Sequence, residues 1–180
     1  MREWVISFLG AMYAGVVPVA INTLLTADDY AYMLEHSRAQ AILTNGALVP
    51  MVQQALAHAQ HEVNHIWVAH PEESGAALPA AFEAMQPWLN RQQPLPHAAK
   101  TNGDDPGFWL YSSGSTGKPK GAVHTHANPY WTAELYAKPV LGLTENDVCF
   151  SAAKLYFAYG LGNALTFPLS VGASVVLMAE

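Results

Sequence analysis

The chain has 180 residues with a formal net charge of −6, and 51% of them are hydrophobic whereas only 12% are charged. This is enough apolar sequence for one substantial core or two small ones. The eight Lys and Arg residues are scattered, so no basic face can follow a nucleic-acid backbone, and nucleic acid is excluded as a partner.

The cysteine content favours a reducing compartment. Cys149 is the single cysteine of the sequence and cannot form an internal disulfide, and no asparagine begins an Asn-x-Ser/Thr glycosylation sequence. Cys149 lies in an apolar stretch, so we interpret it as a small buried hydrophobic residue rather than a nucleophile. We therefore expect a cytoplasmic protein.

An apolar run from Trp4 to Ala27 contains no charged residue and resembles a secretory signal or a membrane span. Glu3 precedes it where a signal requires positive charge, and Gly10 and Pro18 interrupt it. We expect a buried helix followed by a buried strand, without membrane association, although hydropathy alone leaves the membrane alternative open.

Helices and strands alternate in the first 70 residues. Apolar residues at helical spacing predict helices at 5–12, after Thr26 and at about 48–58, and short apolar runs predict strands at 16–21, 41–44 and 65–69. Thr26 is placed to cap its helix, whose first turn carries Asp28 and Asp29. This alternation predicts an α/β fold in which parallel-rich sheet layers are covered on both faces.

Residues 71–106 have a different composition, because prolines surround a single helical patch at 78–89. We interpret this segment as a surface connector. The chain would then divide into a first α/β subregion at 1–70, the connector at 71–106 and a second subregion at 107–180.

The second subregion opens with two strands, 107–111 and 121–125, that flank one loop. Asn128 is placed to cap a following helix that has Pro129 at its first position and runs to about 137. The remaining predicted elements are a strand at 147–152, a glycine-bounded helix at 159–172 and a strand at 173–178.

The loop between the two strands reads YSSGSTGKPKG, residues 111–121. Its glycines, 114, 117 and 121, permit positive φ angles and let a ligand approach the backbone N–H groups. Four hydroxyl side chains together with Lys118 and Lys120 match a polyphosphate in donor density and charge. The loop is neither a Walker A nor a G-x-G-x-x-G motif, because Pro119 follows Lys118 and a strand follows the loop. Composition alone leaves a solvated Gly/Ser turn as the alternative.

The loop resembles the phosphate loop of the adenylate-forming superfamily, which includes acyl-CoA synthetases, luciferases and nonribosomal-peptide adenylation domains. All eleven positions agree with the superfamily pattern Y/F-T/S-S-G-S/T-T-G-x-P-K-G. The resemblance implies that a carboxylate attacks the α-phosphate of Mg²⁺-ATP, pyrophosphate leaves, and a thiol, usually that of CoA, captures the acyl adenylate. It also implies that the loop positions and neutralises the β- and γ-phosphates. The implied nucleotide-binding residues are Ser112, Ser113, Gly114, Ser115, Thr116, Gly117, Lys118 and Lys120.

A second block, AAKLYFAYGLGN at 152–163, lies where most relatives carry a histidine or aromatic residue shortly before a glycine and line the acyl pocket. Together with INTLLTADDYAYMLEHSRA at 21–39, it resembles benzoate–CoA ligases and their hydroxybenzoate relatives. Aromatic side chains suit a planar aromatic acid, although without the family match they would be interpreted as core residues. The implied substrate-binding residues are Phe157, Ala158, Tyr159 and Gly160, of which Ala158 and Tyr159 would contact the ring.

The resemblance covers essentially the whole chain but only about a third of a family member's length. It implies that the residues for adenine and ribose, the acidic Mg²⁺ ligand and a mobile C-terminal domain lie beyond Glu180. We therefore expect a piece of the large N-terminal domain of an aryl-CoA ligase, without metal ligands or a certain catalytic residue of its own and inactive in isolation. The oligomeric state is not specified.

Other patterns suggest other functions. His61-Glu62-Val63-Asn64-His65 matches the H-E-x-x-H signature of zinc hydrolases, which needs both histidines on one helical face. His65 leads into a strand-like stretch, so we expect solvent-facing residues at a helix-to-strand turn instead. A non-catalytic module that binds a nucleotide or an anion is a further alternative. His124 and His126 could approach ATP or could be ordinary residues of one strand face, and both interpretations stay open.

Overall fold

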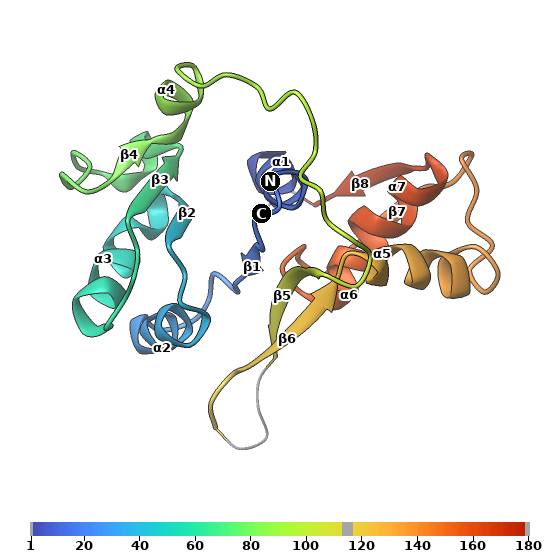
Figure 1. Ribbon diagram of the computed structural model, residues 1–180, viewed down its shortest axis with the longest axis horizontal. Coiled ribbons are helices and arrows are strands. Elements are labelled where there is room, and N and C mark those ends of the chain that lie inside the picture. The colour runs from blue at the N-terminus through green and yellow to red at the C-terminus, as the bar shows by residue number, and fades with distance from the viewer. Residues whose placement is uncertain (1, 113–116, 179–180) are drawn as a thin grey trace. The chain divides into compact units, whose positions relative to one another are not determined.

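The structure is a computed structural model that describes residues 2–112 and 117–178 (Figure 1). The chain forms two compact units. The first comprises Thr23–Pro96 with the residues that precede Trp4, and the second comprises Trp4–Asn22 with the chain from His97 onward. The first 22 residues are thus divided between the two units, and later parts of the chain form most of each unit.

The first unit is a parallel three-stranded sheet, ordered β2-β3-β4, with helices (Figure 1). Its elements are α2 (Ala27–Ser37), β2 (Ala41–Asn45), α3 (Val49–His58), β3 (His65–Ala69), β4 (Glu83–Ala84) and α4 (Met85–Leu89). Val49 and Val52 of α3 pack with Ile66 and Val68 of β3 and with Phe82 in one buried cluster. This cluster is the apolar face that the alternating pattern of β3 predicts.

The capping prediction for α2 is confirmed. The Thr26 hydroxyl accepts a hydrogen bond from the Asp29 backbone N–H at 3.2 Å, and the Asp29 carboxylate accepts one from the Thr26 N–H at 3.1 Å. This reciprocal arrangement satisfies two N–H groups that a helix start otherwise leaves unpaired. A local sequence signal therefore sets where α2 begins.

The second unit contains two small sheets. Its elements are α1 (Arg2–Tyr13, which begins in the first unit), β1 (Val19–Ala20), β5 (Pro106–Ser112), β6 (Lys120–Thr125), α5 (Ala127–Thr132), β7 (Val148–Ser151), α6 (Ala158–Leu161), α7 (Phe167–Val171) and β8 (Ser174–Leu177). π-helical turns at 133–137 and 162–166 continue α5 and join α6 to α7. In one sheet β5 pairs with β1 in parallel and with β6 antiparallel, and in the other β7 and β8 are parallel. With four of the five strand pairs described here parallel, the expected α/β fold with parallel-rich sheets is confirmed.

The core of the second unit joins α1, β5 and α6. Phe8 of α1 meets Phe108 of β5 edge to face, with ring centroids 5.4 Å apart. Leu110 of β5 belongs to the same buried cluster, as do Leu155 and Leu161 from the segment around α6. The strand that leads into the loop and the segment that carries the aromatic block therefore share one core.

The expected helix at 78–89 is wrong over its first half. The chain forms a turn in which the Phe82 N–H donates to the Pro79 carbonyl at 2.8 Å, β4 then pairs with β3, and helix begins only at Met85. Burial of Phe82 among residues of α3 and β3 accounts for this, because tertiary packing overrides local helical spacing. The connector thus contributes a strand to the first sheet.

Two boundaries also differ from expectation. The strand expected at 16–21 pairs only at Val19–Ala20. Pro18 has no N–H to donate, but its carbonyl accepts a hydrogen bond from the Trp109 N–H of β5 at 2.9 Å. Asn128 is not the N-cap of α5, because His126 holds that position, and the Asn128 side chain instead accepts a hydrogen bond from the Thr125 N–H at 3.0 Å.

The lengths of the helices test whether the apolar run at the start of the chain could span a membrane. α1 ends at Tyr13, after 12 residues. Within residues 2–112 and 117–178, none of the helices combines the length and apolar character needed to cross a bilayer.

Candidate functional site

The phosphate-loop candidates lie at the open end of the β5–β6 hairpin. Ser112, the last residue of β5, is in register with Lys120, the first residue of β6 (Figure 1). Ser112, Gly117, Lys118 and Lys120 are all solvent-exposed. The other predicted members lie outside the described residues: Ser113, Gly114, Ser115 and Thr116. The described part thus presents one hydroxyl and two ammonium groups at the same end of the hairpin, where an anion could bind.

The glycines of the loop serve different purposes. Gly117 has φ of +100°, which a residue with a side chain rarely adopts, and this agrees with the expected positive φ. Gly121 does not have a positive φ; a Cβ there would lie 3.0 Å from the Trp109 ring and 3.5 Å from the Tyr111 ring. For Gly121 the explanation is close packing under two aromatic rings of β5, which the expectation for this position missed.

The aromatic block follows β7 and leads into α6. Phe157 is the N-cap of α6, in extended conformation, and its ring lies 4.8 Å from that of Tyr156 at an angle of 60°. Phe157 is 44% exposed and Tyr159 is 69% exposed, and Ala158 is also exposed. Within the described residues, the Phe157 and Tyr159 rings therefore lie at the surface and do not pack into the core cluster around Phe108.

Gly160 is buried and fills a different role from its neighbours. A Cβ at this position would lie 2.6 Å from the Lys154 carbonyl carbon and 2.7 Å from the Ala153 oxygen, and closer still to the Lys154 oxygen. The first turn of α6 thus packs directly on the backbone of the segment that precedes it. Gly160 shapes the block and offers no side chain to a substrate.

Structural contacts account for the two histidines near the loop. The His124 ring, on β6, stacks on the core residue Phe108, with centroids 4.7 Å apart and planes 7° apart. The His126 backbone caps α5, and its N–H donates to the Asp105 carbonyl at 3.1 Å. The ring contact of His124 favours its interpretation as an ordinary residue of the strand.

The H-E-x-x-H sequence does not lie on a helix. Residues 60–64 have no regular structure and His65 begins β3. Glu62 accepts a hydrogen bond from Arg38 Nε at 2.6 Å, and this bond raises the pKa of Arg38. Within the part of the chain that the structure describes, no three His, Cys, Asp or Glu residues form a group that could hold a metal ion. The zinc-hydrolase alternative therefore lacks its geometry.

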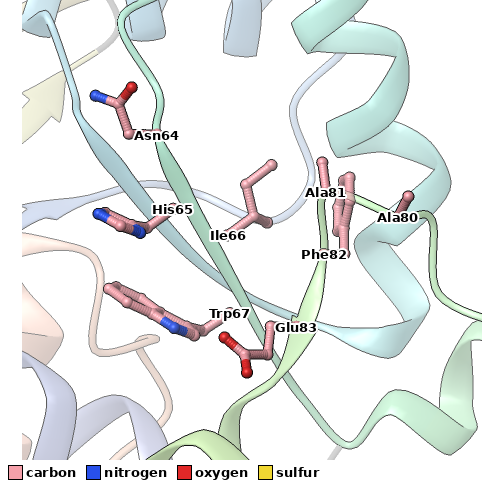
Figure 2. Close-up of a pocket in the computed structure, with 8 residues that line it drawn as sticks. All are labelled: Asn64, His65, Ile66, Trp67, Ala80, Ala81, Phe82 and Glu83. Atoms are coloured by element: carbon pink, nitrogen blue, oxygen red, sulfur yellow. The ribbon is translucent and has the colours of Figure 1, made fainter.

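A cavity of about 360 Å³ lies beside this sequence in the first unit (Figure 2). It opens where β3 and the chain entering β4 diverge, and it is lined by residues 64–67 and 80–83. Figure 2 shows His65 and Trp67 on one side of β3, with Ile66 directed toward Phe82 on the other. The His65 and Trp67 rings are stacked 5.4 Å apart. His65 of the H-E-x-x-H sequence lines this cavity, whereas the predicted nucleotide-binding and substrate-binding residues that the structure describes do not.

Comparison with known proteins identifies the family of the chain and supports its fold. The sequence pattern of the family described as AMP-binding enzyme matches residues 1–180. A curated relative, the benzoate–CoA ligase of Thauera aromatica, is 52% identical over 176 residues, which cover 97% of this chain and 31% of that protein. The chain spans about a third of the length of the curated relatives that it matches.

Two solved structures resemble the chain closely. A benzoate CoA ligase from Burkholderia xenovorans LB400 is 55% identical with a TM-score of 0.83, over 99% of this chain and 33% of that one. The anthranilate CoA ligase AuaEII, solved in complex with anthranoyl-AMP, is 35% identical with a TM-score of 0.90, over 100% of this chain and 34% of that one. Both likenesses confirm the α/β architecture expected from the sequence.

Proposed function

The chain belongs to the AMP-binding enzyme family, and from this premise we propose that the whole protein is an AMP-forming aryl acid–CoA ligase. In this proposal it activates benzoate or a close analogue with ATP and transfers the acyl group to CoA. Residues 1–180 would correspond to part of the N-terminal AMP-binding domain, in which 71–106 connects 1–70 to 107–180 along the sequence while Trp4–Asn22 belong to the second compact unit. A cytoplasmic location fits the single cysteine.

The hairpin end is the observation that carries the nucleotide part of the proposal. Ser112, Lys118 and Lys120 are exposed together next to Gly117, whose positive φ supports a tight turn of the backbone. In the proposed role these residues, with residues 113–116, bind the β- and γ-phosphates of ATP. The ammonium groups of Lys118 and Lys120 would stabilise the negative charge of the pyrophosphate as its bond to the α-phosphorus breaks.

The exposed aromatic rings support an aromatic acid as substrate. Buried rings would serve the core alone, whereas Phe157 and Tyr159 are open to solvent and sit on either side of the small residue Ala158. A planar ring can stack against such side chains, and an aliphatic acid of similar size gains less from the contact. The related proteins named for benzoate and anthranilate support the same substrate class.

The proposed reaction has two half-reactions. A carboxylate oxygen attacks the α-phosphorus of ATP, the bond to the pyrophosphate oxygen breaks, and an acyl adenylate forms; the CoA thiol then attacks the acyl carbon and AMP leaves. The role of this chain's residues is to position the reactants and to stabilise charge. Mg²⁺ is part of the proposal as the partner of ATP, but the described residues offer no cluster of metal ligands, so we assign no step to it.

ATP–pyrophosphate exchange measured on the whole protein across a series of acids tests the proposal. We expect exchange to depend on benzoate and to weaken with cyclohexanecarboxylate, which has similar size but no planar ring. A protein that binds ATP but shows no acid-dependent exchange would instead be a non-catalytic nucleotide-binding module. Exchange that prefers the aliphatic acid would contradict the aromatic pocket while leaving ligase chemistry in place.

A further inference from the structure

Ser151 has an unusual environment at the end of β7. It is 7% exposed and, apart from Tyr30, is the single buried side chain with a polar group in the part of the chain described here. It is paired with Leu177 of β8, at the carboxyl end of two parallel strands. Ligands of open α/β sheets usually bind beyond this end of the strands. The chain leaves the sheet directly after Ser151 and enters the aromatic block.

The Ser151 hydroxyl closes a turn over the next two residues. It accepts a hydrogen bond from the Ala153 N–H at 3.2 Å and lies 3.4 Å from the Ala153 carbonyl, to which it can donate. A serine hydroxyl that bonds to the backbone two residues on is a recognised way to set a turn. Here the turn changes the direction of the chain as β7 ends.

Successive contacts connect this turn to the aromatic rings. Leu155 is buried in the core, and the Phe157 N–H donates to the Lys154 carbonyl at 3.1 Å. The same carbonyl group packs against Gly160, and the Leu161 N–H donates to the Phe157 carbonyl at 2.8 Å. The backbone between Ser151 and Leu161 is therefore held at each end and in the middle, so a shift of the turn is transmitted to Phe157.

We propose that Ser151 is a positioning residue for recognition of the aryl acid. Its hydroxyl holds the turn that sets where Phe157 and Tyr159 present their rings, without itself touching the substrate. This inference rests on the proposed ligase function and adds to it a residue that the motif comparison did not single out. Without the hydroxyl, the Ala153 N–H loses its acceptor and the segment relaxes, so contact with a planar ring weakens.

The test compares Ser151→Ala with Ser151→Thr in the whole protein. For Ser151→Ala we expect kcat/KM for benzoate in ATP–pyrophosphate exchange to fall about fivefold or more, because a part-buried N–H group is left unpaired, while KM for ATP stays within about twofold. The preference for benzoate over cyclohexanecarboxylate should fall as well. Ser151→Thr retains the hydroxyl and should recover most of the loss.

Ser170→Ala is the matched control. The Ser170 hydroxyl also makes a local bond, donating to the Phe167 carbonyl at 2.7 Å in α7, but it lies outside the segment from 151 to 161. We expect this variant to leave both KM values and the acid preference unchanged. If Ser151→Ala does not fold, Ser151→Cys retains the size with a weaker acceptor, and the same selective loss is expected.

The outcomes separate the two proposals. A wild-type protein without acid-dependent exchange overturns the ligase function and this inference with it. A wild-type protein that exchanges with benzoate, combined with an unchanged acid preference in Ser151→Ala or Ser151→Cys, overturns the inference alone. An equal loss for ATP and benzoate also overturns it, because a general structural defect would affect both substrates.

Discussion

Replacement of Gly160 by alanine should destabilise the chain because a methyl group has no space there. The new Cβ would lie 2.6 Å from the Lys154 carbonyl carbon, about 0.9 Å inside the optimal carbon separation of about 3.5 Å. The nearest atoms are all backbone, so they cannot rotate away. Overpacking typically costs about 1–3 kcal/mol, and we expect a value near about 3 kcal/mol for this rigid contact. At about 2–4 °C per kcal/mol for a chain of this size, Tm should fall by about 6–12 °C.

Thermal unfolding of the 180-residue chain, followed by circular dichroism, measures this effect, and Gly10→Ala provides a matched control. Gly10 lies inside α1, and a Cβ there would meet no atom within 4 Å. Alanine at an unobstructed helix position is more favourable than glycine by about 0.5–1 kcal/mol, so this variant should have a raised Tm. If Gly160→Ala had the same or a higher Tm than the wild type, the packing of α6 on the Lys154 backbone would be refuted.

Other predictions concern the loop, a helix cap and pH. Lys120→Ala and Gly117→Ala in the whole protein should each slow adenylation at least about tenfold, about 1.4 kcal/mol in barrier, and unchanged single-turnover pyrophosphate release would contradict their role. Thr26→Ala should lower the unfolding free energy by about 1 kcal/mol through loss of the capping box, and an unchanged urea midpoint would count against it. Hydrogen bonds from the Thr144 N–H and hydroxyl lower the pKa of Asp147. Its stabilising contribution is therefore complete above the unfolded pKa of about 3.9 and is lost as pH falls from there through the lowered folded pKa. Asp147→Asn should flatten the acid limb of a Tm–pH profile, and an identical acid limb in both proteins would show that the turn does not depend on this charge.

Local signals in the sequence predicted many elements correctly. The bounds of β3, His65–Ala69, agree with the expected strand, and the glycine-bounded helix ends at Gly172, whose φ is +77°. The predicted N-cap at Thr26 is also correct. Each of these features depends on residues within one or two turns of chain, so the sequence window contains the whole cause.

The expectations that failed depended on distant neighbours. The helical spacing at 78–84 was overridden because Phe82 packs against α3 and β3. The expected positive φ is absent at Gly121, where close packing against Trp109 and Tyr111 of the paired strand leaves no space for a side chain. The lack of space for a side chain at Gly160 also depends on a fold contact, with the Lys154 backbone.

The sequence by itself determined the residue types of the loop, the N-cap of α2 and the alternation of strands and helices, because these follow from neighbouring residue types. Only the tertiary structure decided that β1 pairs with β5 across more than eighty residues, that Phe157 and Tyr159 are exposed, and that Ser151 is buried. Strand pairing and burial depend on which distant segments meet. No short window of sequence contains that information, since it arises from competition among all the apolar surfaces of the chain.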